Sequence, residues 1–151
     1  MKLATPRWWY VRRGAPAPTL RVLLRPISWI WAAATARRVA KAPTFDPGIP
    51  VISVGGLTVG GTGKTPVARA LLKRLSGSHA LSRGYGGKLA GPVQVDPAQH
   101  GAADVGDEPL MLAKDFPVWV SRDRVAGAKA AVAAGANTLV LDDAHQNPAL
   151  T

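Results

Sequence analysis

Short apolar runs alternate with stretches of helical periodicity from Val51 onward. An apolar run bounded by turn residues is typical of a buried strand, and apolar positions spaced three and four residues apart are typical of a helix. The expected strands span 51–54, 80–82, 93–95, 118–120 and 138–141, and the expected helices span 65–75, 108–114 and 122–134. Strands that alternate with helices predict an α/β fold with a parallel sheet, right-handed crossovers and flanking helices. The Ala/Gly-rich stretch 126–136 fits a closely packed helix better than disorder.

The residues before Pro43 follow a different pattern. Apolar side chains recur at helical spacing, and polar or basic side chains fall largely on the other side of the same helix. The apolar set is Leu20, Leu23, Leu24, Ile27, Ile30, Trp31 and Ala34, and the polar set is Arg21, Arg25, Ser28 and Thr35. Pro26 either begins this helix or kinks it. We therefore expect a basic amphipathic helix ahead of the α/β region.

Charge separates the two regions as well. The chain has 151 residues with 19 Lys+Arg and 9 Asp+Glu, which gives a net charge of +10. Residues 1–41 hold nine of the bases and none of the acids, so residues 42–151 carry a net charge of only +1 (ten bases against nine acids). Four of the five tryptophans also lie in the basic segment. With the turn-rich segment 43–50 as the joint, we expect a Trp-rich arm at residues 1–42 and a core at residues 43–151.

The arm fits binding at a membrane surface better than crossing of a membrane. Its longest charge-free stretch, 26–36, has eleven residues, whereas a spanning helix needs about 20. An amphipathic helix with Arg on one side and Trp at headgroup depth fits peripheral binding to an anionic membrane surface. A core-packing helix with solvated Arg side chains is the alternative; secretion and nucleic-acid binding are weaker interpretations, and we expect no nucleic-acid partner. The absence of cysteine excludes a disulfide framework and a Cys nucleophile.

The clearest chemical signal is a glycine-rich segment that follows an expected strand and opens an expected helix, Thr58-Val59-Gly60-Gly61-Thr62-Gly63-Lys64-Thr65. Glycine lets successive backbone N–H groups converge on phosphate oxygens, and the helix N-terminus adds partial positive charge. In a phosphate-binding loop of this kind, Lys64 reaches the β- and γ-phosphates of ATP, and the Thr65 hydroxyl ligates Mg²⁺. Thr58 stands where the strict pattern has Gly. The alternative is a glycine-rich turn with an incidental lysine.

Two acidic segments fit the same nucleotide site. Asp142 and Asp143 follow the apolar strand 138–141, where a carboxylate beside the phosphate loop can hold Mg²⁺ directly or through water. A surface loop is the alternative for this pair. Asp107, within Gly106-Asp107-Glu108-Pro109, is a candidate catalytic base that accepts a proton from an acceptor hydroxyl, and a helix cap is its alternative role.

Basic residues follow two further strands. The glycine-rich segment 82–87 contains Arg83, whose guanidinium fork matches a phosphate, although a plain glycine turn explains this segment nearly as well. Arg122 and Arg124 follow the strand 118–120 and either face anions or are solvated at the start of a helix. The three histidines show no metal-ligand spacing, so we expect them to be structural or exposed.

Taken together, these motifs resemble the tetraacyldisaccharide 4′-kinase family, the lipid A kinases of Gram-negative bacteria. The resemblance rests on six segments that occur in order along the chain: 51–55, 57–66, 82–87, 105–110, 122–124 and 141–143. It implies a P-loop NTPase-like fold that transfers the γ-phosphate of ATP, with Mg²⁺, to the 4′-hydroxyl of a tetraacylated glucosamine disaccharide 1-phosphate. It also implies a peripheral location at the cytoplasmic face of the bacterial inner membrane.

The resemblance assigns roles to individual residues. Lys64 and Thr65 contact the nucleotide and Mg²⁺ in this assignment. Asp142 and Asp143 form the second carboxylate motif, and Asp107 is the catalytic base.

The family's chain is about twice as long as this one, whereas a chain of this size is typically one domain. We therefore expect residues 43–151 to be the N-terminal part of the kinase core, with an incomplete sheet and little or no lipid kinase activity by itself. Two other classes stay open, namely a nucleotide-binding module without kinase activity and a membrane-surface interaction protein. Nucleotide affinity separates these two from each other, and phosphorylation of the lipid separates both from the kinase.

Overall fold

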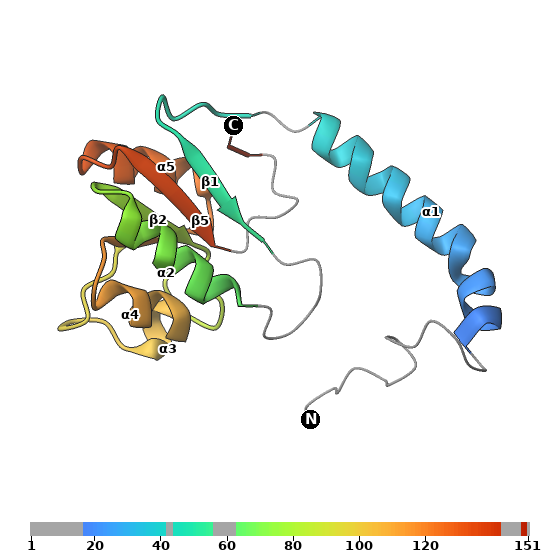
Figure 1. Ribbon diagram of the computed structural model, residues 1–151, viewed down its shortest axis with the longest axis horizontal. Coiled ribbons are helices and arrows are strands. Elements are labelled where there is room, and N and C mark those ends of the chain that lie inside the picture. The colour runs from blue at the N-terminus through green and yellow to red at the C-terminus, as the bar shows by residue number, and fades with distance from the viewer. Residues whose placement is uncertain (1–16, 42–43, 56–62, 143–148, 151) are drawn as a thin grey trace. The chain divides into compact units, whose positions relative to one another are not determined.

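The computed structural model describes residues 17–41, 44–55, 63–142 and 149–150, whose helices and strands are labelled in Figure 1. Contacts between Cα atoms divide the chain into two units, Met1–Lys41 and Ala42–Thr151. Within the described residues, the first unit contributes a helix, and the second contains the sheet with its flanking helices.

Helix α1 spans Ala17–Lys41 and is longer than the expected amphipathic segment. Pro26 lies inside this helix instead of at its start. The Ser28 hydroxyl donates to the Leu24 carbonyl (3.0 Å), so this polar side chain is satisfied by its own helix. The described large apolar side chains of α1, from Val22 to Trp31, are exposed, and Trp29 and Trp31 keep 71% and 74% of their surface.

The apolar side chains of α1 are not confined to one side. At 100° per residue, Leu23, Ile27 and Trp31 fall on one stripe, whereas Val22 and Trp29 fall on the far side. Across the part of the chain that the structure covers, none of the helices has the length and hydropathy that a bilayer span requires.

The second unit is built on a five-stranded sheet with the order β1-β5-β2-β4-β3. The strands are β1 Val51–Val54, β2 Ser78–Ser82, β3 Val93–Gln94, β4 Val118–Val120 and β5 Thr138–Asp142. The pairs β1–β5, β5–β2 and β2–β4 are parallel, as expected, whereas β3 pairs with β4 in the antiparallel sense. The sheet is therefore mixed, with a short antiparallel edge strand of the kind common on α/β sheets.

Helices cover both faces of this sheet. They are α2 Lys64–Arg74, α3 Ala102–Val105, α4 Asp107–Ala113 and α5 Arg124–Ala133. On one face, buried side chains of α2, α3 and α4, such as Leu72, Val105 and Leu112, pack with Val118 and Val140 of the sheet. On the other face, α5 packs Ala128 and Ala131 against Leu81 and Leu139, so α2 and α5 lie on opposite faces (Figure 1).

The small residues of α5 let this helix approach the sheet closely. A Cβ atom on Gly127 would lie 2.6 Å from Cδ1 of Leu81 and 2.8 Å from Cβ of Ser121, distances that allow no larger residue without a shift. The structure therefore confirms a packed helix for the Ala/Gly-rich stretch 126–136 as far as Ala133, where α5 ends.

The strands and helices predicted from the apolar pattern are all present. The predicted and observed bounds agree at several ends and differ by one or two residues at the others. Helix α3 was not predicted. It has four residues, of which Val105 is the one large apolar side chain, so it has no periodicity to detect. Its first turn is held by Asp104, whose carboxylate accepts from the Gly101 N–H (2.9 Å).

Candidate functional site

The motifs found separately in the sequence meet at one edge of the sheet. Because β1, β5, β2 and β4 run parallel, their carboxyl ends lie along the same edge in that order. The glycine-rich segment follows β1, Asp142 ends β5, Arg83 follows β2, and Arg122 lies two residues beyond β4. Ligands of parallel α/β sheets bind at this edge, so the topology makes it the candidate functional site.

The described end of the glycine-rich segment leads directly into helix α2. Gly63 is the N-cap residue and has φ +77°, a left-handed conformation that glycine adopts without strain. Lys64 and Thr65 form the first turn of α2, and both are half-buried. The strand–loop–helix order that a phosphate-binding loop requires is therefore present. Thr58, Val59, Gly60, Gly61 and Thr62 lie outside the described residues.

Asp142 lies beside the end of β1, the strand that precedes the glycine-rich segment in the sequence. Its Cα is the register partner of Val54 in the parallel β1–β5 pair. Side chains alternate along a strand, so Asp142 falls on the same face as Val140, which is the face that α2 covers. Asp142 is 3% exposed, so the surface-loop alternative is wrong for this residue. Asp143 lies outside the described residues.

Arg124 holds the ends of two strands together. This side chain is 4% exposed, its Nη1 donates to the Leu81 carbonyl of β2 (2.8 Å), and its Nη2 donates to the Asp142 carbonyl of β5 (3.1 Å). The solvated-charge expectation for Arg124 is therefore wrong. The arginine instead fixes the backbone at Asp142, and Asp123 before it caps α5 by accepting from the N–H groups of Val125 and Ala126.

Helix α4 brings a second acidic segment to the start of α2. The Thr65 hydroxyl donates to Oε1 of Glu108 (3.2 Å), and farther along α2 Nη2 of Arg69 forms an ion pair with Oδ2 of Asp115 (2.6 Å). Glu108 follows Asp107, so the candidate base lies next to a residue that contacts the candidate Mg²⁺ ligand. These contacts join segments more than 40 residues apart in the sequence.

Asp107 is exposed and is the first residue of α4. The N-cap position belongs to Gly106, which supplies no side-chain cap. The helix-cap alternative for Asp107 is therefore wrong, and its carboxylate is left facing solvent at the site.

The loop after β2 packs against the turn that precedes α4. A Cβ atom on Gly87 would lie 2.6 Å from the Asp104 carbonyl oxygen, and one on Gly106, at φ +92°, would lie 2.7 Å from the Tyr85 carbonyl oxygen. Two backbone bonds reinforce the contact, since the N–H groups of Lys88 and Leu89 donate to the carbonyls of Ala103 and Asp104 (3.0 and 2.9 Å). The glycines of the segment 82–87 thus permit this loop to pack closely against α3 and the turn after it, which a plain turn does not require.

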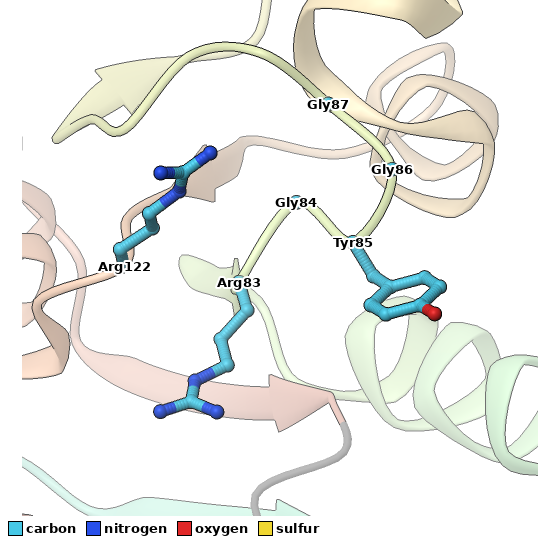
Figure 2. Close-up of a pocket in the computed structure, with 6 residues that line it drawn as sticks. All are labelled: Arg83, Gly84, Tyr85, Gly86, Gly87 and Arg122. Atoms are coloured by element: carbon cyan, nitrogen blue, oxygen red, sulfur yellow. The ribbon is translucent and has the colours of Figure 1, made fainter.

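A pocket of about 320 Å³ lies over this loop and is lined by Arg83, Gly84, Tyr85, Gly86, Gly87 and Arg122. Figure 2 shows Arg83 and Arg122 extending from neighbouring segments with their guanidinium groups directed apart. Both arginines are exposed, and Tyr85 keeps 97% of its surface. The pocket therefore offers two separate positive groups and one accessible aromatic ring.

The described histidines have structural partners. His79 is buried, and its Nδ1 accepts from Nε1 of Trp119 (3.2 Å); burial lowers the pKa of His79 below its usual value. Nδ1 of His100 accepts from the Asp96 N–H (2.9 Å). Among the residues with described positions, no three His, Cys, Asp or Glu side chains form a metal-binding group by themselves. His145 lies outside them.

Glu108 was assigned no role from the sequence, and Arg124 was not expected to be buried against the strand ends. Glu108 stood in a recognised motif, but its partner Thr65 is 43 positions away, and a single sequence carries no signal of that contact. Arg124 offered a clue, because it is the only charge in the first turn of an otherwise Ala/Val-rich helix. A lone arginine at such a position can be buried when carbonyl groups at strand ends accept its hydrogen bonds.

Comparisons with known proteins agree with this geometry. The sequence profile of the family described as "Tetraacyldisaccharide-1-P 4'-kinase" matches residues 20–151. The chain is 65% identical over 150 residues to a tetraacyldisaccharide 4′-kinase of Phenylobacterium zucineum, and 63% identical over 154 residues to one of Caulobacter vibrioides. These alignments include 99% of this chain but 45% and 46% of the two relatives, so the chain spans just under half of their length.

A solved structure shares the fold. It is LpxK from Aquifex aeolicus, described as an "apo" form in complex with ATP, and it matches with a TM-score of 0.73 and 32% sequence identity. The match covers 87% of this chain and 46% of that one.

Proposed function

The chain belongs to the tetraacyldisaccharide-1-P 4′-kinase family, and on that premise we propose that it provides the ATP-binding part and the catalytic base of a lipid kinase. The proposed reaction transfers the γ-phosphate of ATP to the 4′-hydroxyl of an acylated glucosamine disaccharide 1-phosphate, a step of lipid A biosynthesis. The observation that carries the proposal is the meeting of α2, Asp142 and the start of α4 at one sheet edge.

In this proposal the start of α2 binds the nucleotide. Lys64 is the first residue of α2, and at a helix N-terminus positive charge from the backbone also favours phosphate. A lysine at this position meets the β- and γ-phosphates and offsets their charge during transfer. The Aquifex aeolicus protein was solved in complex with ATP, which supports nucleotide binding by this fold.

The residues present also fit Mg²⁺. The candidate ligands are hard oxygen groups, namely the half-buried Thr65 hydroxyl and the buried Asp142 carboxylate on the face that α2 covers. Mg²⁺ prefers oxygen ligands and is usually held by few protein groups together with substrate phosphates and water. When bound, the metal ion supplies charge neutralisation at the phosphates. Thr65 and Asp142 would hold it, with Asp143 as a further candidate.

Asp107 is the proposed base. Its carboxylate is exposed at the first residue of α4, and the next residue contacts Thr65. A carboxylate in that position can accept the proton of the attacking hydroxyl as the phosphoryl group is transferred. The exposed arginines of the pocket in Figure 2 are proposed to attract the phosphate groups of ATP or of the lipid.

Helix α1 is the proposed membrane element. Its exposed apolar stripe and the basic composition of residues 1–41 support peripheral binding to an anionic membrane, at the cytoplasmic face of the bacterial inner membrane. The lipid acceptor also has to be reached at a membrane surface, which favours an arm of this type.

A second candidate function is nucleotide binding without transfer, which is favoured by the fact that the chain spans just under half the length of its relatives. The test is transfer of labelled γ-phosphate from ATP to the tetraacylated disaccharide by chain 1–151, with Asp107→Asn as the comparison. We expect transfer far below the roughly 1–100 s⁻¹ typical of kinases, and we expect it to depend on Asp107. Absent transfer would favour the binding module. Measurable transfer that is unchanged in Asp107→Asn would contradict the assignment of Asp107 as the base.

A further inference from the structure

Glu108 contacts the one hydroxyl that the proposed function assigns to Mg²⁺. The Thr65 hydroxyl donates its hydrogen to Oε1 of Glu108 at 3.2 Å. Thr65 is half-buried in the first turn of α2, and Glu108 is exposed in the first turn of α4. The two side chains therefore meet on the solvent-exposed side of the site. Their contact joins α2, which is proposed to bind phosphate, to α4, which carries Asp107.

The direction of this hydrogen bond determines whether the Thr65 hydroxyl oxygen can face a cation. A threonine hydroxyl has one hydrogen and two lone pairs. When the hydrogen points to a carboxylate, the lone pairs are turned away from it and can face a cation. An acceptor behind a metal ligand also fixes the orientation of that ligand and raises its basicity, and the loss of such an acceptor typically costs about 10–100-fold in metal affinity.

We propose that Glu108 is a positioning residue that orients the Thr65 hydroxyl for Mg²⁺ and that acts through Thr65 without binding the metal itself. This inference rests on the proposed function, because it requires that Thr65 ligates the metal of a bound nucleotide. It adds a residue that neither the sequence motifs nor the family resemblance assigned. It also couples the metal site to the candidate base, since Glu108 and Asp107 are neighbours at the start of α4.

The structure supplies a matched control for this proposal. A second polar contact joins the same two segments, the ion pair between Nη2 of Arg69 and Oδ2 of Asp115 (2.6 Å). Arg69 lies one turn after Thr65 on α2, and Asp115 lies just beyond the end of α4. Removing this ion pair loosens the attachment of α4 without touching the hydroxyl, so it separates a general packing effect from orientation of the ligand.

The experiment measures the affinity of chain 1–151 for ATP by calorimetry at increasing Mg²⁺ concentrations and in EDTA. The variants are Glu108→Ala, Glu108→Gln and Asp115→Asn, and thermal unfolding shows that each is folded. We expect the Mg²⁺ concentration for half-maximal tightening to rise about tenfold in Glu108→Ala, with the EDTA affinity unchanged. Glu108→Gln retains an oxygen acceptor and should stay close to wild type, and so should Asp115→Asn.

The outcomes distinguish the inference from the proposed function. If the wild-type chain binds no ATP under any condition, the proposed function is wrong and the inference falls with it. If the wild type binds ATP with Mg²⁺ and Glu108→Ala responds to Mg²⁺ equally well, the inference alone is overturned. The inference is also overturned if Glu108→Gln weakens the response to Mg²⁺ as much as Glu108→Ala does. That result would indicate that the Glu108 carboxylate binds Mg²⁺ directly through its charge. In a Thr65→Ala background, replacing Glu108 should have no further effect.

Discussion

At the scale of single residues, Arg124 is a buried polar side chain with specific partners at the ends of two strands. A buried guanidinium is costly unless its N–H groups are satisfied, and here two of them meet the carbonyls of Leu81 and Asp142. The same contacts fix the strand end that carries a candidate Mg²⁺ ligand. Arg124 therefore stabilises the ends of β2 and β5 and also holds the backbone of a candidate Mg²⁺ ligand in place.

His79 gives a residue-scale prediction about pH. Burial disfavours the charged imidazolium and lowers the pKa of His79 in the folded protein below the usual value of about 6.5. The unfolded chain then binds more protons, so the free energy of unfolding should fall as pH drops below about 6.5 toward the lowered pKa. Protonation of Nδ1 would also remove the acceptor for the Trp119 N–H.

The check is urea unfolding of wild type and His79→Asn between pH 7.5 and 5.5, a window of about two units around the ordinary histidine pKa. Asparagine keeps an acceptor and does not titrate, so the free energy of unfolding of His79→Asn should vary less over this range. An equally steep loss of stability in both proteins would contradict the assignment to His79.

At the scale of elements, α1 differs from the other helices because its large apolar side chains are exposed. Deletion of residues 1–41 removes nine of the net ten positive charges, and each basic residue near an anionic surface contributes about 1 kcal/mol to binding. We therefore expect the deletion to abolish sedimentation with anionic vesicles. Sedimentation that survives the deletion would favour a core-packing role for α1.

A pair of tryptophans tests how α1 lies on the membrane. Trp31 belongs to the apolar stripe, whereas Trp29 lies on the far side of the helix and is similarly exposed, at 71% against 74%. Trp31→Ala should weaken vesicle binding about thirtyfold, because loss of a buried aromatic side chain costs on the order of 2 kcal/mol. Trp29→Ala should have the smaller effect, and equal losses would speak against an oriented interfacial helix.

At the scale of the whole molecule, the apolar pattern predicted the sequence of strands and helices in the core, because strands such as β2 and β5 are largely buried and α2 buries one face. The runs at Val51–Val54 and Val118–Val120 match their strands without any shift. The antiparallel sense of β3 was not predictable, since two residues of half-buried and exposed character carry no signal of direction. Helix α3 was missed for the same reason of length.

The candidate site was predictable only in pieces. Local chemistry marked Lys64, Thr65, Asp107 and Asp142, because each stands in a short motif beside an expected strand or helix. Contacts between distant segments, such as Thr65 with Glu108 and Arg124 with Asp142, are set by how the helices pack on the sheet. A single sequence does not encode that packing in a readable local pattern, so the partners came from the structure.

The central claim is that the sheet edge at the start of α2 binds the phosphates of ATP through Lys64, and calorimetry of Mg²⁺-ATP with chain 1–151 tests it most directly. Lys64→Ala removes the charge proposed to meet the β- and γ-phosphates, and Lys73→Ala removes an exposed charge from the last turn of the same helix as a control. Charge-assisted hydrogen bonds contribute about 1.5–3 kcal/mol, so affinity should fall about ten- to a hundredfold in Lys64→Ala and stay at the wild-type value in Lys73→Ala. An ATP affinity in Lys64→Ala equal to that of the wild type would contradict the claim.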